Sequence, residues 1–268
     1  MLKTVIFDMD GVIIDSEAQH AKASLNTFKE LGVDTDLDYC KSFTGSSSKK
    51  MAETAIKDFS LDITTNALLD KLNLAKKKLH EKEGYIPVEG VDALIKRLYK
   101  DGVQLAIASS SSPKEIETVV KKLGIKKYFE KLVSASSVAN PKPSPDTFLL
   151  ALEKLGAAPE NTVIIEDSTF GVKAAKAANV ACIGFINPNS GNQNLNDADV
   201  LIESFDGIDK TFIENTLLRS QGKPLTIAST KRLFIRELAV SDIPDIYPIY
   251  SDPQVKKYID NIDDYLEL

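Results

Sequence analysis

The sequence predicts an α/β protein: a doubly wound parallel sheet with an inserted all-helical cap. Three observations support this prediction. Apolar, β-branched runs alternate with helical patterns along most of the chain, which is typical of a parallel sheet covered by helices on both faces. The apolar runs show no polar alternation, as expected of strands that are buried on both sides. Between the first run and the second, residues 17–83 carry only helical patterns.

Each strand is expected where apolar residues follow one another without interruption. The expected strands cover residues 4–7, 103–108, 132–133, 162–165, 180–184 and 199–202. Helices are expected between them, and several end at a glycine. These glycines are Gly32, Gly102, Gly124 and Gly156. Asp15 and Ser16 are typical of a helix start, and Pro113 suits the first turn of another helix.

The chain divides into four parts. The α/β core is expected to comprise residues 1–16 and 84–218, and the helical cap residues 17–83. Residues 219–230 contain glycine, proline and small polar residues, which indicate a linker. Residues 231–268 begin a new pattern that is too short to form an independent hydrophobic core.

Composition limits the possible functions. The chain has 268 residues, of which 43% are hydrophobic, enough for a sizeable core. Its net charge of −6 argues against binding to nucleic acid or to an anionic membrane, because either partner requires a basic surface. The two cysteines lie far apart, as in a reduced cytosolic protein. With no signal peptide and no apolar run near the ~20 residues of a membrane helix, we expect a cytoplasmic protein.

Reactive residues follow several expected strands. Asp8 and Asp10 come directly after the first strand and point the same way, because they are two residues apart in an extended chain. Gly11 then allows a sharp turn. Ser109 ends a second strand, and the pair Glu166-Asp167 follows a third. Since ligands bind at the carboxyl ends of the strands in such sheets, we expect these side chains to share one site.

An acidic cluster of this kind requires cations. Two carboxylates ~4 Å apart repel each other by roughly 4 kcal/mol at an effective dielectric constant near 20. Lys142, between Pro141 and Pro143, would supply one positive charge, and Mg²⁺ suits the remaining oxygen ligands. Such a site fits phosphoryl transfer, with Asp8 as the nucleophile and Asp10 as the general acid and base.

Together these residues resemble the four motifs of the haloacid-dehalogenase superfamily of phosphohydrolases. The motifs are Asp8-Met9-Asp10-Gly11-Val12, Ser109, Lys142, and Glu166-Asp167-Ser168 followed by Gly171-Val172. The resemblance covers residues 1–218 and implies a Rossmann-like core. Three segments resemble sequences of the branch that contains β-phosphoglucomutase and the sugar-phosphate phosphatases: Asp15-Ser16-Glu17, Pro141–Asp146 and Ile165–Ser168.

The resemblance also implies roles for individual residues. Asp8 would be the nucleophile and a metal ligand, and Asp10 the acid and base, with its backbone carbonyl on the metal. Asp167 would bind Mg²⁺ with Glu166 beside it. The residues expected to hold the phosphoryl group or the rest of the substrate are Ser109, Ser110, Lys142, His20, Gly45, Ser48 and Lys78. We expect His80 to lie on the surface.

Several departures bear on the activity. In β-phosphoglucomutase an arginine follows shortly after the glycine of the cap loop, and Ser48 occupies that position in this chain. The mutase also carries a tryptophan, whereas this chain has none. These differences favour a phosphatase for a small phosphorylated metabolite, such as a sugar phosphate, over a phosphomutase. Two further alternatives are a phosphonate hydrolase that uses a cap lysine and a non-catalytic module that senses a phosphometabolite. A monomer is expected, because a capped enzyme closes over its own site.

The last part of the chain resembles a different family. Residues 232–238, 241–242 and 250–253 are similar to the start of an acetyl-CoA-dependent N-acetyltransferase. The glycine-rich turn for the pyrophosphate of acetyl-CoA is absent. This resemblance predicts that the chain is a truncated piece of a longer two-enzyme protein.

Overall fold

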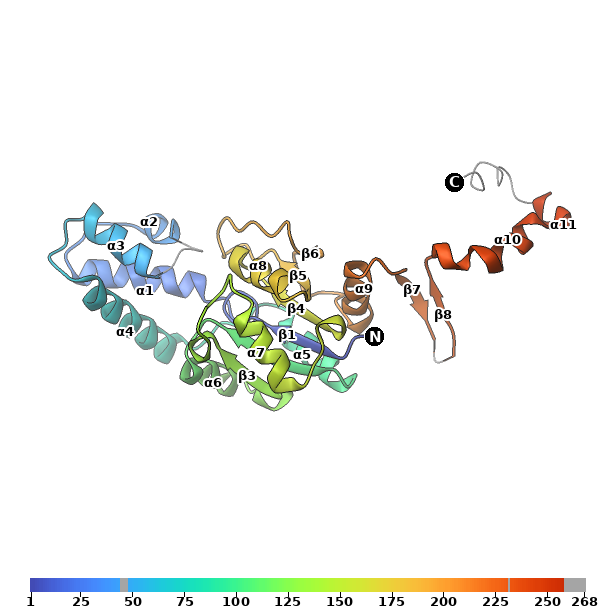
Figure 1. The fold of residues 1–268 in the computed structure, drawn as a ribbon. Coiled ribbons are helices and arrows are strands. Elements are labelled where there is room, and N and C mark those ends of the chain that lie inside the picture. Colours follow the sequence, from blue (N-terminus) through green and yellow to red (C-terminus); the bar gives the residue numbers. More distant parts are fainter. Residues whose placement is uncertain (44–47, 231, 258–268) are drawn as a thin grey trace. The chain divides into compact units, whose positions relative to one another are not determined.

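The structure, a computed structural model, describes residues 1–43, 48–230 and 232–257 and confirms the expected fold class (Figure 1). A six-stranded sheet has the order β3-β2-β1-β4-β5-β6, and every neighbouring pair is parallel. The strands are β1 Thr4–Phe7, β2 Gln104–Ser109, β3 Lys131–Ser134, β4 Thr162–Glu166, β5 Ala181–Phe185 and β6 Val200–Ile202. The strand order reverses between β1 and β4, and the crevice at such a point is the usual ligand site of an open α/β sheet.

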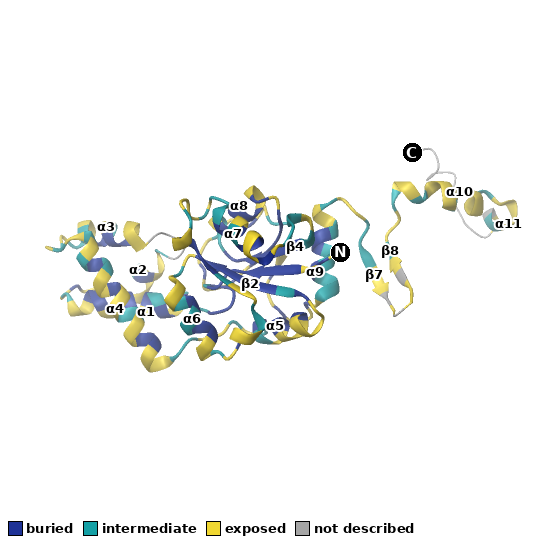
Figure 2. Cartoon of the chain, turned by 60° about the horizontal axis from the view of Figure 1, so that its bottom comes forward, coloured by how far each residue is buried: buried dark blue, intermediate teal, exposed yellow. Residues whose placement is uncertain are grey.

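Helices cover both faces of the sheet. Val5 and Phe7 belong to a hydrophobic cluster with residues of α5 (Val91–Lys100), α6 (Pro113–Lys122) and α9 (Lys210–Ser220). Ile6, on the other face of β1, packs in a cluster with residues of α7 (Asp146–Leu155) and α8 (Thr169–Ala177). Because successive strand residues point to opposite faces, β1 to β5 each contribute to both clusters, whereas β6 contributes only to the first. Figure 2 shows the strands of this sheet buried along most of their length.

In its described residues, the insertion between β1 and α5 contains helices joined by loops and no named strand. Its helices are α1 Glu17–Glu30, α2 Leu37–Lys41, α3 Ser48–Asp58 and α4 Thr65–Glu83. A third hydrophobic cluster lies between these helices and includes Phe28, Met51, Leu68 and Leu72. The sequence places the start of α1 correctly, but Ser16 makes no capping bond to the helix.

The two connections between this cap and the core run side by side. The backbone N–H of Asp15 donates to Ile86 O at 2.8 Å, and that of Val88 donates to Ile13 O at 3.0 Å. One turn into the cap, the side chain of Gln19 donates to the backbone carbonyl of Gly84 at 3.0 Å. The entry and the exit of the insertion are therefore held together.

Residues 218–268 form a separate compact unit. An antiparallel pair of strands, β7 Thr226–Ser229 and β8 Phe234–Arg236, precedes the helices α10 Ile243–Ser251 and α11 Pro253–Lys256. Strand β7 lies inside the segment interpreted as a linker, so that segment is not irregular throughout. None of the residues from 218 to 257 whose burial is described is buried (Figure 2).

No helix in the described part of the chain is long and apolar enough to cross a membrane.

Candidate active site

The carboxyl ends of β1, β2 and β4 bring the expected site residues together. Parallel pairing aligns Phe7 with both Ile107 and Ile165. The backbone N–H of Asp8 then donates to Ile165 O at 3.0 Å, so the chain remains in register just past the strand. Asp8, Ser109 and Glu166 therefore occupy the same edge of the sheet, and all three are buried.

Lys142 joins the ends of all three strands. Its Nζ donates to Asp8 Oδ1 at 2.5 Å, to Glu166 Oε1 at 2.7 Å and to the carbonyl of Ala108 at 3.1 Å. The same nitrogen lies 4.7 Å from the centre of the Phe148 ring. Only 6% of the lysine side chain is exposed, so the ammonium group exchanges its water contacts for these four partners.

Glu166 is fully engaged by the protein. Its second carboxylate oxygen, Oε2, accepts from the backbone N–H and from the hydroxyl of Ser168, both at 2.9 Å. The Ser168 hydroxyl in turn accepts from the N–H of Gly171 at 3.0 Å and caps α8. Glu166 therefore holds the lysine with one oxygen and Ser168 with the other.

Gly171 leaves room for that carboxylate. A Cβ atom at this position would lie 1.8 Å from Glu166 Oε1. Alanine normally stabilises a helix relative to glycine, but here Gly171→Ala is expected to destabilise the protein by about 1–3 kcal/mol through overpacking. Thermal unfolding should show a lower Tm for this variant and little change for Lys173→Ala, an exposed control on the same helix. An unchanged or higher Tm for Gly171→Ala would contradict the close approach.

Asp167 faces the turn that follows β1. It accepts a hydrogen bond from the Ser190 hydroxyl, and both side chains are buried. Gly11 has a φ of +83°, and a Cβ there would lie 1.9 Å from Asp167 Oδ2. Glycine therefore satisfies two demands at this position: a left-handed backbone and close approach of a carboxylate.

Asp10 is held by the loop after β2. The hydroxyl of Ser111 donates to Asp10 Oδ2 at 2.7 Å, and the backbone N–H of Ser111 donates to Ser109 Oγ at 3.0 Å. Ser134, at the end of β3, donates to the carbonyl of Ser111 at 2.6 Å. Ser111 therefore links the second aspartate to two neighbouring strands.

The charges in this cluster are not balanced. Burial raises the pKa of Asp8 to about 7; Lys142 opposes this rise, whereas Glu166 and Asp10 add to it. Burial raises the pKa of Asp167 well above its usual range, and the charges of Glu166 and Asp8 raise it further. Burial alone would lower the pKa of Lys142, but Asp8 and Glu166 outweigh burial and raise it. The lysine therefore stays charged, and one cation compensates a larger number of carboxylates.

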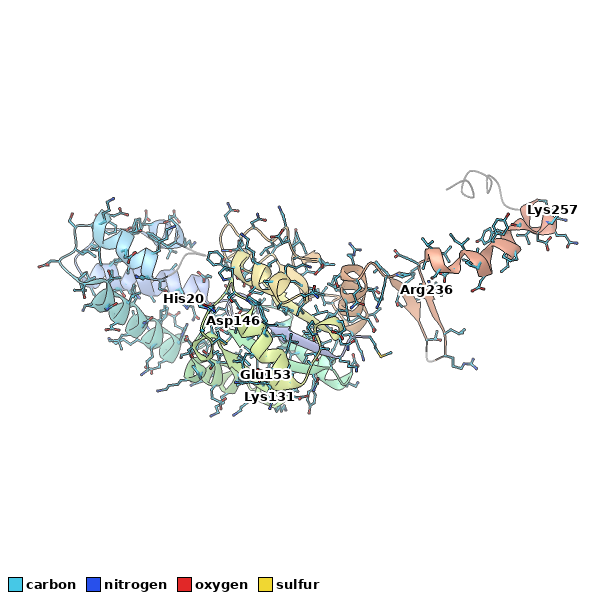
Figure 3. All side chains as sticks on the ribbon, viewed as in Figure 1. His20, Lys131, Asp146, Glu153, Arg236 and Lys257 are labelled. Carbon is cyan, nitrogen blue, oxygen red and sulfur yellow. The ribbon has the colours of Figure 1, made fainter. Side chains whose placement is uncertain are left out.

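A cavity of about 750 Å³ opens between the cap and the core. It reaches the acidic cluster through Ser110 and Ser111, and the latter holds Asp10. His20 lines it from the first turn of α1, at the end of the cap that adjoins the core (Figure 3). Ser48, at the start of α3, also lines it, whereas Gly45 lies outside the described residues.

The cap helix α4 presents different residues from those expected. Lys76 lines the cavity, and the expected residue Lys78 does not. His80, expected on the surface, is only 7% exposed and lines the same cavity. Residues four apart share a face of a helix, so Lys76 and His80 point the same way, while Lys78 is turned about 200° from Lys76.

Sequence reasoning missed Ser111, Ser190, Lys76 and Glu115, which lie at or beside the site. Ser111 could have been identified from its place two residues after a strand-end serine. Ser190 carries no such signal, because it lies in an irregular loop between β5 and β6.

The protein has a parallel sheet with a buried carboxylate–lysine cluster at its carboxyl edge and an inserted helical cap. These features place it in the class of enzymes with a capped Rossmann-like core. The model of the family "Haloacid dehalogenase-like hydrolase" matches residues 5–185. The chain belongs to this family, and the family identifies it as a hydrolase. The N-acetyltransferase-like start expected at residues 231–268 lies outside the matched residues and gains no support from the family match.

This chain aligns with most of the length of two curated relatives. Fructose-1-phosphate phosphatase YqaB of Escherichia coli is 31% identical over 180 residues, or 67% of this chain and 94% of that protein. A phosphorylated carbohydrates phosphatase of Thermotoga maritima is 31% identical over 212 residues, or 76% of this chain and 91% of that protein. Among solved structures, CbbY from Rhodobacter sphaeroides in complex with phosphate superposes with a TM-score of 0.68 at 26% identity, covering 80% of this chain and all of that one.

Proposed function

We propose that the protein is a magnesium-dependent phosphatase that hydrolyses a small phosphorylated sugar through a phosphoryl group carried on Asp8. The observation that carries this proposal is the bridge from Lys142 to both Asp8 and Glu166 at the carboxyl edge of the sheet. It fixes a charged amine against the carboxylate that would receive the phosphoryl group. The names of the sugar-phosphate phosphatases among the relatives support the substrate class.

The reaction proceeds in two displacements. In the first, a carboxylate oxygen of Asp8 attacks phosphorus, the bond to the leaving oxygen breaks, and Asp10 protonates that oxygen. In the second, Asp10 takes a proton from water, the water oxygen attacks phosphorus, and the bond to Asp8 breaks to release inorganic phosphate. Ser111 holds Asp10 in place for both proton transfers.

Lys142 and Ser109 stabilise the charge on the transferring phosphoryl group. The lysine ammonium already stands 2.5 Å from Asp8 Oδ1. Ser109 Oγ accepts from the N–H of Ser111, which leaves its own proton free to be donated to a phosphoryl oxygen. Donors fixed before the substrate arrives favour the transition state, because no reorganisation is required when the charge develops.

The acidic residues fit a magnesium ion. In the described residues, no group of three or more His, Cys, Asp or Glu side chains is arranged to hold a metal. Mg²⁺ needs only one or two protein carboxylates, with water and substrate oxygens completing its shell. Asp8 and Asp167 would supply these, with the backbone carbonyl of Asp10, and their mutual repulsion indicates a missing positive charge. When bound, the ion neutralises charge on the phosphoryl oxygens.

A phosphate-release screen tests the function. The full chain is assayed over a panel of phosphorylated sugars, polyols and carboxylic acids, with Mg²⁺ and then with excess EDTA. We expect release from sugar phosphates with Mg²⁺, a loss of at least about 100-fold with EDTA, and recovery when Mg²⁺ is restored. Release that is indifferent to EDTA would rule out the metal. Primer-dependent isomerisation of a hexose phosphate with negligible phosphate release would identify a phosphomutase instead.

A further inference from the structure

Some polar residues that line the cavity between the cap and the core have no role in the two displacement steps proposed above. Glu115 lines it from α6 of the core, and His80 lines it from α4 of the cap. Neither residue belongs to the group that contacts the phosphoryl position. Both lie close enough to Asp10 to feel its charge, as the pKa of each responds to it. They therefore stand where the part of the substrate beyond the leaving oxygen would lie.

Glu115 is not used as a helix cap. The hydroxyl of Ser112 accepts from the N–H of Glu115 at 3.3 Å and caps α6. A glutamate at this position often returns the bond to the backbone of the capping residue, yet in the described part of the chain no such bond is made. The carboxylate faces the cavity instead, where burial and then Asp10 raise its pKa. His20, Lys76 and a hydrogen bond with the Ser111 side chain oppose this rise.

His80 has a nitrogen without a partner. Nε2 is buried and makes no hydrogen bond within the described residues. The ring lies against Tyr85, with centroids 4.5 Å apart, and 6.1 Å from the ring of His20. Burial and then His20 lower the pKa of His80, so the ring is neutral and offers one donor and one acceptor.

The lysines that line the cavity differ in their surroundings: Lys77, Lys114 and Lys122 are exposed to water, whereas Lys76 is half-buried. Lys77 Nζ lies 3.8 Å from Glu81 Oε1, and His20 Nδ1 lies 3.8 Å from Glu17 Oε1. Burial lowers the pKa of Lys76, and Glu17, Asp10 and Glu115 oppose that effect. The exposed lysines keep their water contacts, whereas the less exposed groups Glu115 and His80 are available for hydrogen bonds to a ligand.

We propose that Glu115 and His80 are specificity-determining residues that bind hydroxyl groups of the leaving group. The preferred substrate is then a monophosphate ester of an uncharged, polyhydroxylated carbon chain, and phosphorylated carboxylic acids are disfavoured. A carboxylate accepts hydrogen bonds from hydroxyl groups, whereas it repels another carboxylate. This inference rests on the proposed phosphatase function and names the part of the substrate that the cap and α6 recognise.

The test compares three esters with the full chain and Mg²⁺. Fructose 1-phosphate carries several hydroxyls, 2-phosphoglycolate carries a carboxylate, and p-nitrophenyl phosphate carries neither. Glu115→Gln and His80→Gln are each expected to lower kcat/KM for fructose 1-phosphate about tenfold and to leave p-nitrophenyl phosphate within about twofold. Glu115→Gln should also raise kcat/KM for 2-phosphoglycolate. The controls, Glu153→Gln on α7 and Lys82→Gln on α4, are exposed, lie outside the cavity lining and should change none of the three.

The outcomes distinguish a failure of the proposed binding site for the leaving group, formed by Glu115 and His80, from a failure of the proposed phosphatase function. An equal fall on all three esters, accompanied by a lower Tm, would show a structural role and overturn the inference. So would a wild-type preference for 2-phosphoglycolate over fructose 1-phosphate, a result that needs no variant. In both cases the phosphatase function would stand. If the wild type hydrolysed none of the three, the proposed function would fail, and the subsite would fail with it.

Discussion

Replacing Asp8 with asparagine is expected to lower phosphate release by a factor on the order of 10⁴ or more, as when other catalytic nucleophiles are removed. The amide keeps the shape of the side chain but cannot attack phosphorus. Folding should be retained, because the surroundings disfavour the charged carboxylate: burial raises the pKa of Asp8 to about 7 even with Lys142 in contact.

Two measurements on Asp8→Asn test whether Asp8 is the nucleophile. Steady-state phosphate release gives kcat, and thermal unfolding gives Tm, with the exposed Asp101→Asn as the control for both. Turnover near that of the wild type would remove Asp8 from the reaction. A variant that stays folded, binds a sugar phosphate and has lost turnover would exclude the alternative of a non-catalytic sensor, for which turnover is irrelevant.

Replacing Lys142 with methionine is expected to cost about 3–5 kcal/mol in the free energy of unfolding, because it leaves buried carboxylates without their cation. Asp8 and Glu166 would lose their shared partner, and their side chains are 9% and 1% exposed. Activity should fall as well, since the lysine also stabilises the transferring phosphoryl group.

Urea unfolding of Lys142→Met, with the exposed Lys154→Met as control, measures this loss. The pH dependence gives a second check. Unpaired buried carboxylates take up protons more readily in the folded than in the unfolded protein, so stability falls as pH rises. The deficit should therefore be largest at high pH and shrink as the pH is lowered. A deficit below about 1 kcal/mol would mean that the bridge contributes no more than a surface ion pair.

The core and its acidic cluster could be predicted because two local rules are sufficient. Uninterrupted apolar runs identify buried parallel strands, and the carboxyl ends of such strands meet at one edge. Asp8, Ser109 and Glu166 each follow such a run, and the structure brings them together. Lys142 was recognisable from its stiff, proline-flanked loop, and its Nζ reaches that same edge.

The cap residues could not be read in the same way. Residues 76–78 are three consecutive lysines, so no contrast between polar and apolar positions reveals which of them turns inward. The burial of His80 depends on Tyr85, which lies beyond the helix, and on His20 from another helix. Ser190 reaches Asp167 from a loop 23 residues further along the chain, and no periodic pattern predicts such a contact.

The paired connections at Asp15–Ile86 and Ile13–Val88 make the cap an exchangeable module. The insertion leaves and re-enters the core at adjacent points. A different insert grafted between Ser16 and Gly84 is therefore expected to leave the strand order and the acidic cluster unchanged. Such a chimaera would keep the reacting groups of the core and acquire a new cap-side wall for its substrate pocket. In evolution as in engineering, the choice of substrate can thus diverge without altering the chemistry.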